Sequence, residues 1–425
     1  MRWDNLRLNE PTTLDAAAPD AAVPLFARDA VTRTFDTPGF RGMTFYEVHA
    51  KSIVSRVPRS SRMPFTWTIN PYRGCQHACA YCFARSSHNY LDLDAGHDFD
   101  SKVVVKVNAP QLLRAKLASP GWAGEHIAMG TNVDCYQRAE GRYQLMRGII
   151  AALRDAANPF SILTKGTLIL RDLDLLLESA EVTDVGLNVS AGFVDKDLWR
   201  AIEPGTPAPE RRLEACATLA DSGLGCGVLM GPVVPYLSDS PAQLEAAVRQ
   251  VAAAGAAHVT PIVLHLRPGT REWFMGWLRE AHPRLLPRYA ELYGRGAYAP
   301  RQYQERITGQ IRELARKHGV GRAAGNPRRI RPEPASRAPA RPSETLLSTH
   351  EQLTLLLPRT GRQIGCGRPH PVADVTAVTQ GNNNSGPGHA LGPPGRSPPC
   401  QACLKTFDLL VSRAPEPRRR TRSGT

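Results

Sequence analysis

The sequence predicts an α/β fold in which strands and helices alternate along the chain. Short apolar runs of strand length recur between residues 103 and 264. The runs are residues 103–107, 126–129, 160–164, 185–189, 227–230 and 259–264. Helical patterns separate them, and this repetition predicts a parallel sheet with crossover helices. Because the runs are almost continuously apolar, the sheet is covered on both faces or closes into a barrel.

The helices predicted between these strands are residues 109–118, 142–155, 172–179, 209–222 and 241–254. The chain divides into three parts by periodicity. Residues 1–45 have little periodicity and are expected to form an N-terminal extension. Residues 46–320 form the ordered domain, which ends in a helical closing segment over residues 273–320. Residues 321–425 are rich in Pro, Gly and Arg, a composition that cannot bury a core, and we expect a disordered tail.

Charge and cysteine content limit the classes of function. The 425-residue chain has a formal net charge of +14, but residues 322–425 alone hold 16 Lys and Arg against 6 Asp and Glu. The rest is close to balanced, so charge gives little reason to expect a nucleic-acid-binding face on the folded part. No apolar run is long enough to span a membrane, and the first residues lack a secretory pattern, so we expect a cytoplasmic protein. Nine cysteines in that compartment indicate metal ligands or free thiols rather than disulfides.

The strongest motif is residues 70–85, NPYRGCQHACAYCFAR. Cys75, Cys79 and Cys82 form a C-x3-C-x2-C arrangement, with Tyr81 just before the third cysteine. A structural zinc site needs four ligands and is usually built from two paired knuckles, whereas three thiolates crowd one loop here. Three cysteines on a [4Fe–4S] cluster leave one iron open to chelate S-adenosylmethionine (SAM).

Three alternatives to a SAM-binding cluster stay open for this motif. The spacing can arise by chance. A zinc ion can be completed by His77 or His88. A cluster can also serve electron transfer alone, without SAM. Each alternative is weaker than a cluster that binds SAM, because the three-cysteine spacing and the aromatic residue occur together.

The motif and five further stretches resemble the radical SAM superfamily. Within it, the chain resembles the spore photoproduct lyase-like group, in an actinobacterial-type subfamily whose substrate is unknown. The matching stretches are residues 63–74 (MPFTWTINPYRG), 130–140 (GTNVDCYQRAE), 162–167 (ILTKGT), 203–206 (EPGT) with Arg212 and Leu213, and 264–268 (LHLRP). The resemblance covers about residues 40–320. It implies a partial (β/α)6 TIM-like barrel, with the cluster loop after the first barrel strand and the active site at the carboxyl ends of the strands.

The residues expected to bind the cofactor SAM are Tyr81, Asp134, Lys165, Ser190 and Arg212. Asp134 follows the second strand, where a carboxylate can accept hydrogen bonds from the methionyl ammonium group, or can cap the next helix. Lys165 can pair with the cofactor carboxylate, or lie solvated at the strand end. Ser190 can hydrogen-bond the cofactor or a local turn, and Tyr81 can contact the adenine. For Arg212, cofactor or substrate binding and an internal ion pair with Glu203 are equally open.

One departure from the lyases concerns hydrogen donation. The resemblance places their hydrogen-donating cysteine three residues before Asp134, and that position is Thr131 here. Cys135 and Tyr136 follow Asp134 directly and are the candidate catalytic residues, because thiols and phenols both donate hydrogen atoms. A structural role as a buried free cysteine is the commoner case for a residue such as Cys135. The departure puts reversal of a DNA photoproduct in doubt.

The sequence therefore predicts a radical SAM enzyme that generates a 5′-deoxyadenosyl radical. The expected partners are an unknown substrate, with nucleic acid among the open classes, and an electron donor such as flavodoxin or ferredoxin. The alternative is an iron–sulfur or zinc module that contacts nucleic acid through the basic tail without radical chemistry. Salt-dependent nucleic-acid affinity, in place of SAM cleavage, distinguishes it.

Overall fold

A seven-stranded sheet forms the centre of the structure, a computed structural model that describes residues 30–58 and 63–321. Its strand order is β11-β10-β9-β8-β7-β4-β3. The strands are β3 (Val54–Arg56), β4 (Trp67–Ile69), β7 (Ile127–Met129), β8 (Phe160–Thr164), β9 (Val185–Ser190), β10 (Cys226–Val233) and β11 (Val259–Val263). From β4 to β11 all pairings are parallel, and β3 adds an antiparallel edge. This arrangement is the predicted partial TIM-like barrel.

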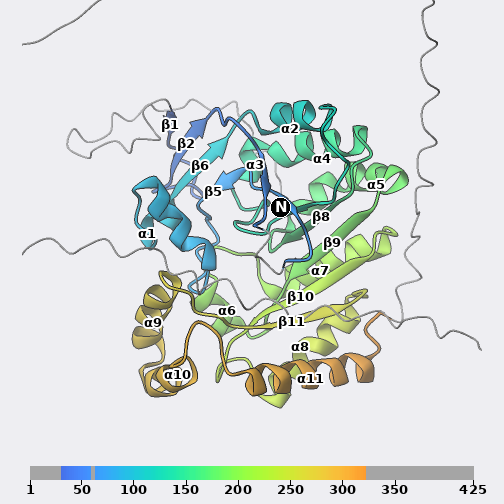
Figure 1. The fold of residues 1–425 in the computed structure, drawn as a ribbon. Coiled ribbons are helices and arrows are strands. Elements are labelled where there is room, and N and C mark those ends of the chain that lie inside the picture. The colour runs from blue at the N-terminus through green and yellow to red at the C-terminus, as the bar shows by residue number, and fades with distance from the viewer. Residues whose placement is uncertain (1–29, 59–62, 322–425) are drawn as a thin grey trace, which may run out of the picture. The chain divides into compact units, whose positions relative to one another are not determined.

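Helices connect the parallel strands in chain order (Figure 1). They are α3 (Glu140–Tyr143), α4 (Leu145–Asp155), α5 (Leu173–Val182), α6 (Lys196–Ile202), α7 (Pro209–Asp221) and α8 (Pro241–Ala253), together with the 3-10 segment η4 (Thr167–Asp172). The closing segment is α9 (Thr270–Ala281), η5 (Pro283–Leu285), α10 (Leu286–Leu292) and α11 (Arg301–His318). The connection from β4 to β7 is the longest and contains the cysteine loop. After that loop come η3 (Phe83–Leu91), α1 (His97–Ser101), β6 (Lys102–Lys106) and α2 (Ala109–Leu117).

One predicted barrel strand belongs to a different sheet. The run 103–107 corresponds to β6, which lies in a four-stranded sheet of order β1-β2-β6-β5. Its partners are β2 (Thr44–Val48), which is parallel, and β5 (Tyr72–Arg73), which is antiparallel; β1 (Val31–Arg33) completes the sheet. Val103, Val104 and Val105 are all buried, and a buried apolar run does not reveal which sheet it joins. The first barrel strand is instead β4, whose three residues are too few to give a periodic signal.

Part of the predicted N-terminal extension packs on the domain. The rings of Phe35, Phe40 and Phe45 meet with centroids 5.3–5.8 Å apart, and all three side chains are buried. The predicted boundary at residue 45 therefore runs through β2. The predicted tail lies, apart from Gly321, outside the described residues.

Two large hydrophobic clusters stabilise the domain, beside a small one formed by Tyr46, Leu91, Leu93 and Val104. The largest involves side chains of β7, β8 and β9 and of helices α2, α4, α5 and α7. The second involves β10, β11, α8 and the closing helices. No helix in the described ranges is long and apolar enough to cross a membrane.

Candidate cluster and cofactor site

A cavity of about 440 Å³ opens at the carboxyl ends of the parallel strands. In parallel barrels this edge carries the chemistry, because the loops that follow the strands converge there. Its walls come from the cysteine loop, from β7 to β11 and from the residues that follow them. Among the lining residues are Cys75, His77, Cys79, Tyr81, Cys82, Phe83, Thr131, Asp134, Lys165, Asn188, Ser190 and His265.

Three cysteines of one loop line this cavity together. Cys75 and Cys79 are buried and Cys82 is half-buried; none of them forms a disulfide. Burial raises the pKa of all three thiols, so they are poor nucleophiles, and metal ligation is what deprotonates such groups. This donor set fits metal binding rather than nucleophilic catalysis.

The three cysteines can be compared with the ligand sets of a single metal ion and of an iron–sulfur cluster. Across the described ranges, no three His, Cys, Asp or Glu side chains converge closely enough to hold a single metal ion. In a cubane cluster each thiolate binds a different iron, so its ligands stand farther apart than those around one tetrahedral zinc. Three soft thiol donors on one loop, lining one cavity, are a donor set that fits a [4Fe–4S] group, which would leave one iron open for SAM.

Hydrogen bonds from the surrounding protein fix the cysteine loop. The Gln137 side chain accepts from the Gln76 amide at 3.1 Å and donates to the Gly74 carbonyl at 3.0 Å. Gly74 has φ +84°, and a Cβ there would lie 2.5 Å from the Lys102 carbonyl oxygen, so only glycine fits. On the other side, the amide of Ala80 donates to the Ile202 carbonyl at 2.9 Å.

Asp134 joins the cysteine loop to the end of β8. Its carboxylate accepts from the Thr164 hydroxyl and the Lys165 amide, both at 2.6 Å, and from the Tyr136 amide at 2.9 Å. His77 Nδ1 lies 3.4 Å from the same carboxylate. Burial lowers the pKa of His77 to about 4, so the imidazole is neutral near pH 7. Asp134 lines the cavity, yet much of its hydrogen-bonding capacity is used within the protein.

Lys165 presents its ammonium group at the cavity wall. Its Nζ donates to the Ser190 hydroxyl at 2.9 Å and lies 5.8 Å from the centroid of the Tyr81 ring. Ser190 in turn donates to the Gly231 carbonyl at 3.1 Å. Three of the residues predicted to bind the cofactor, Tyr81, Lys165 and Ser190, are thus brought together around one positive charge.

Arg212 lies behind the cavity wall. It is buried and donates to the carboxylate of Glu203, to the Thr206 hydroxyl at 2.6 Å and to the carbonyls of Ser190 and Pro207 at 3.1 and 2.7 Å. The Tyr81 hydroxyl donates to the same carboxylate of Glu203. Of the two options open for Arg212, the geometry shows the internal ion pair, and the residue does not line the cavity.

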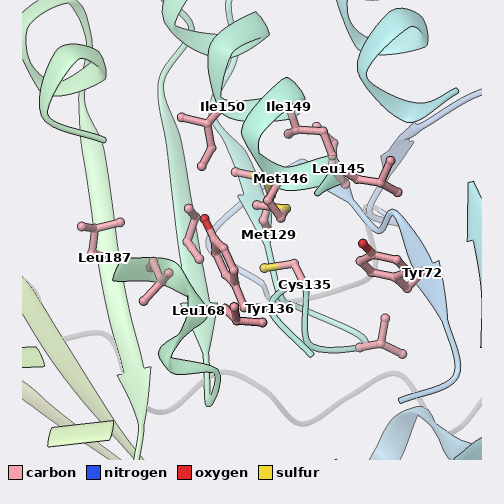
Figure 2. Close-up of a cluster of buried hydrophobic side chains, with 14 of the residues drawn as sticks. Tyr72, Met129, Cys135, Tyr136, Leu145, Met146, Ile149, Ile150, Leu168 and Leu187 are labelled. Atoms are coloured by element: carbon pink, nitrogen blue, oxygen red, sulfur yellow. The ribbon is translucent and has the colours of Figure 1, made fainter. Parts of the chain in front are cut away.

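Cys135 and Tyr136 do not line this cavity, and their side chains lie in the hydrophobic cluster drawn in Figure 2. Cys135 is fully buried among apolar side chains, including Met129 and Met146, and does not line the cavity. The Tyr136 hydroxyl donates to Asp172 at 3.0 Å. A radical relay through these two residues stays a prediction, and the geometry does not favour it because neither residue lines the cavity of the cysteines.

A second cavity of about 780 Å³ is lined in large part by residues of η4 and α7. His77 lines both cavities. Gly205 and Thr206, which also line the second cavity, belong to the loop that packs against the cysteine loop. A Cβ on Gly205 would lie 1.9 Å from the Gln76 carbonyl oxygen, so the two loops touch through their backbones.

Two residues near the cluster loop are absent from the predicted site residues. His77 occupies the loop itself, and the sequence indicates it only as a spare zinc ligand. Arg85 is the last residue of the motif, and its guanidinium donates to the Cys79 carbonyl. The proximity of an arginine to three cysteines is the signal that the sequence offers for it.

The chain matches one family model and several known proteins. Residues 69–246 match the Radical SAM superfamily. An uncharacterized protein of Mycobacterium bovis is 48% identical over 314 residues, which cover 74% of this chain and 92% of that protein. An uncharacterized protein of Methanocaldococcus jannaschii is 34% identical over 173 residues, covering 41% of this chain and 62% of that protein.

A solved structure gives the fold relationship. A mutant of spore photoproduct lyase with bound AdoMet and dinucleoside spore photoproduct has a TM-score of 0.50, covering 65% of this chain and 79% of that chain. Only 14% of residues are identical, so the likeness establishes the shared fold. Superfamily membership in turn implies a [4Fe–4S] cluster and SAM as cofactors. With its three-cysteine loop at the carboxyl edge of a partial barrel, the chain belongs to the radical SAM superfamily.

Proposed function

We propose that this protein cleaves SAM reductively and uses the product radical to abstract a hydrogen atom from a substrate in the same cavity. The observation that carries the proposal is the placement of Cys75, Cys79 and Cys82 on the wall of the cavity that also receives Lys165. When bound, the cluster and SAM supply a one-electron cleavage that gives methionine and a 5′-deoxyadenosyl radical.

The residues of the chain bind and orient the cofactor in this proposal. Lys165 offers an ammonium group to the methionyl carboxylate, and Ser190 holds that ammonium at 2.9 Å. Asp134 fixes the backbone of Lys165 and lines the cavity, where its carboxylate is the proposed acceptor for the methionyl ammonium group. Tyr81 presents its ring to the same space, while its hydroxyl is held by Glu203. Arg212 is a positioning residue, because it acts through Glu203 and Ser190.

For the substrate, we propose a chemical class and no individual compound. The matched lyase structure contains a dinucleoside photoproduct, and a nucleic-acid component is therefore one candidate substrate. At the lyase donor position this chain has Thr131, which lines the cavity and shares a 2.6 Å hydrogen bond with the Thr68 hydroxyl. A hydroxyl is a poor hydrogen-atom donor compared with a thiol, so we do not propose photoproduct reversal. The electron comes from a donor protein such as flavodoxin or ferredoxin.

Anaerobic reconstitution tests the proposal. The full chain should bind about four iron and four sulfide per molecule. With dithionite and SAM, it should release 5′-deoxyadenosine slowly even without substrate. Replacing Cys75, Cys79 and Cys82 together by Ala should abolish both results. Stoichiometric zinc without iron after anaerobic expression would contradict the proposal, and nucleic-acid affinity without SAM cleavage would favour the binding-module alternative.

A further inference from the structure

Arg85 carries a fully buried positive charge against the backbone of a cluster ligand. It lies three residues after Cys82, at 0% relative exposure. Its Nε and one terminal nitrogen donate to the Cys79 carbonyl at 3.2 and 3.1 Å. The other terminal nitrogen donates to the Gly96 carbonyl at 2.8 Å. The guanidinium therefore joins the backbone of Cys79 to the backbone of Gly96.

The surroundings of this charge are largely apolar. The guanidinium carbon lies 4.6 Å from the centroid of a Trp273 ring and 5.2 Å from that of Phe99. A buried charge is costly unless it is paired, and Asp100 supplies the counter-charge at 2.8 and 2.9 Å. The Asp100 side chain keeps 15% of its exposure, whereas that of Arg85 keeps none. Arg85 donates directly to the Cys79 carbonyl, whereas Asp100 contacts Arg85, so the positive charge is the one held against the loop.

We propose that Arg85 and Asp100 set the reduction potential of the cluster from behind Cys79, with opposite signs. The inference rests on the proposed function, since it needs a cluster on Cys75, Cys79 and Cys82. Reduction adds one negative charge, which a buried cation stabilises and a carboxylate opposes; charge and hydrogen bonding near the sulfurs tune such potentials. Arg85 is a positioning residue for the loop as well, because it holds the Cys79 carbonyl.

The test is a redox titration of the anaerobically reconstituted full chain, followed by electron paramagnetic resonance. Arg85→Gln should shift the midpoint to a more negative potential, and Asp100→Asn should shift it to a more positive one. We expect about a tenfold change in the ratio of reduced to oxidised cluster at a fixed ambient potential, which is about 59 mV for one electron. Arg85→Lys keeps the charge and should stay near the wild-type midpoint.

Controls separate electrostatics from loop structure. Arg154 pairs with Asp155 and Glu178 at the helix surface, and Arg154→Gln should leave the midpoint unchanged. Equal midpoints in wild type, Arg85→Gln and Asp100→Asn would overturn the inference, as would shifts of the same sign in the last two. If Arg85→Gln does not fold, the direction of the Asp100→Asn shift decides. A wild-type chain that takes up no iron would instead refute the proposed function.

Discussion

The carboxylate of Asp134 accepts a hydrogen bond from the backbone amide of Lys165 at 2.6 Å, although the two residues follow different strands. Asp134 comes after β7, and Lys165 comes directly after β8. The bond fixes the point from which the Lys165 side chain reaches Ser190 and the cavity. The two residues therefore form one unit, in which the first orients the second.

Substitution of Lys165 by Met should weaken SAM binding and leave the iron content unchanged. A charge-assisted hydrogen bond contributes about 1.5–3 kcal/mol, so the affinity should fall about ten- to a hundredfold. Asp134→Ala should weaken binding to a similar degree and also lower the melting temperature, because it leaves the Lys165 and Tyr136 amides without their acceptor. Isothermal titration with SAM and iron analysis of both variants check this. Wild-type affinity in both would refute the assignment.

The buried pair Glu203–Arg212 should make the free energy of unfolding depend on pH in the acid range. Burial alone would raise the pKa of Glu203, but the Arg212 guanidinium and the Lys165 ammonium outweigh it and hold the pKa below its usual value. A carboxylate with a lowered pKa in the folded state stabilises the protein above its ordinary pKa, and this stability is lost as the pH falls through the folded value. The wild-type melting temperature should therefore drop on acidification below about pH 4.5.

Glu203→Gln tests that dependence. At pH 7 it leaves the Arg212 charge buried without a counter-charge and should cost about 3–5 kcal/mol. Below about pH 4.5 the difference in stability from wild type should narrow, because the Glu203 carboxyl of the unfolded wild-type chain takes up a proton before the folded one, whose pKa is lowered. A constant gap from pH 3 to pH 7, measured by thermal unfolding, would be inconsistent with an ionised Glu203.

Gly205→Ala should reduce cluster loading. The added Cβ would lie 1.9 Å from the Gln76 carbonyl oxygen, and the loop that holds the cysteines would have to move. Overpacking of this kind costs about 1–3 kcal/mol. Gly276→Ala, in α9, is the matched control, since a Cβ there meets nothing within 4 Å and should stabilise the helix by about 0.5–1 kcal/mol. The iron content and the melting temperature of the two variants test this prediction. Equal iron content in both would show that the contact between Gly205 and the cysteine loop does not affect cluster binding.

Cys135→Ala should keep the cluster, SAM affinity and slow release of 5′-deoxyadenosine. Its side chain lies in the core, so the expected effect is a loss of about 1 kcal/mol of stability. A radical relay would show itself differently, by normal uncoupled cleavage and failed turnover once the true substrate is present. Chemical denaturation and deoxyadenosine yield measure the two effects separately.

The alternation of apolar strands and helices is sufficient to predict the order of the fold. Five of the six predicted runs are neighbouring parallel strands, because each run is buried and bounded by helical patterns. The exception is the run at β6, which pairs with β2 instead. Pairing partners depend on contacts between distant segments, and local periodicity does not contain them.

For the site too, the residues that one motif contains can be predicted from the sequence, whereas contacts between distant segments cannot. Cys75, Cys79 and Cys82 are recognisable because one loop holds all three. The places of Lys165 and Asp134 follow from the rule that strand ends converge. The direction of the Cys135 side chain and the internal role of Arg212 cannot be read from the motifs, because both depend on which way a side chain turns at a known position. The sequence shows that Arg85 is close to the three cysteines, but it does not show the pairing with Asp100, which lies beyond the motif.

Gln137, Ile202 and Arg85 hold the cysteine loop through hydrogen bonds to its backbone, and none of these bonds uses a thiol as the donor or acceptor. Oxidative loss of iron would therefore leave every one of these contacts in place. The loop would keep its shape and accept new iron without a second loss of backbone entropy. A chain stripped of iron should therefore take it up again on anaerobic reloading without prior refolding.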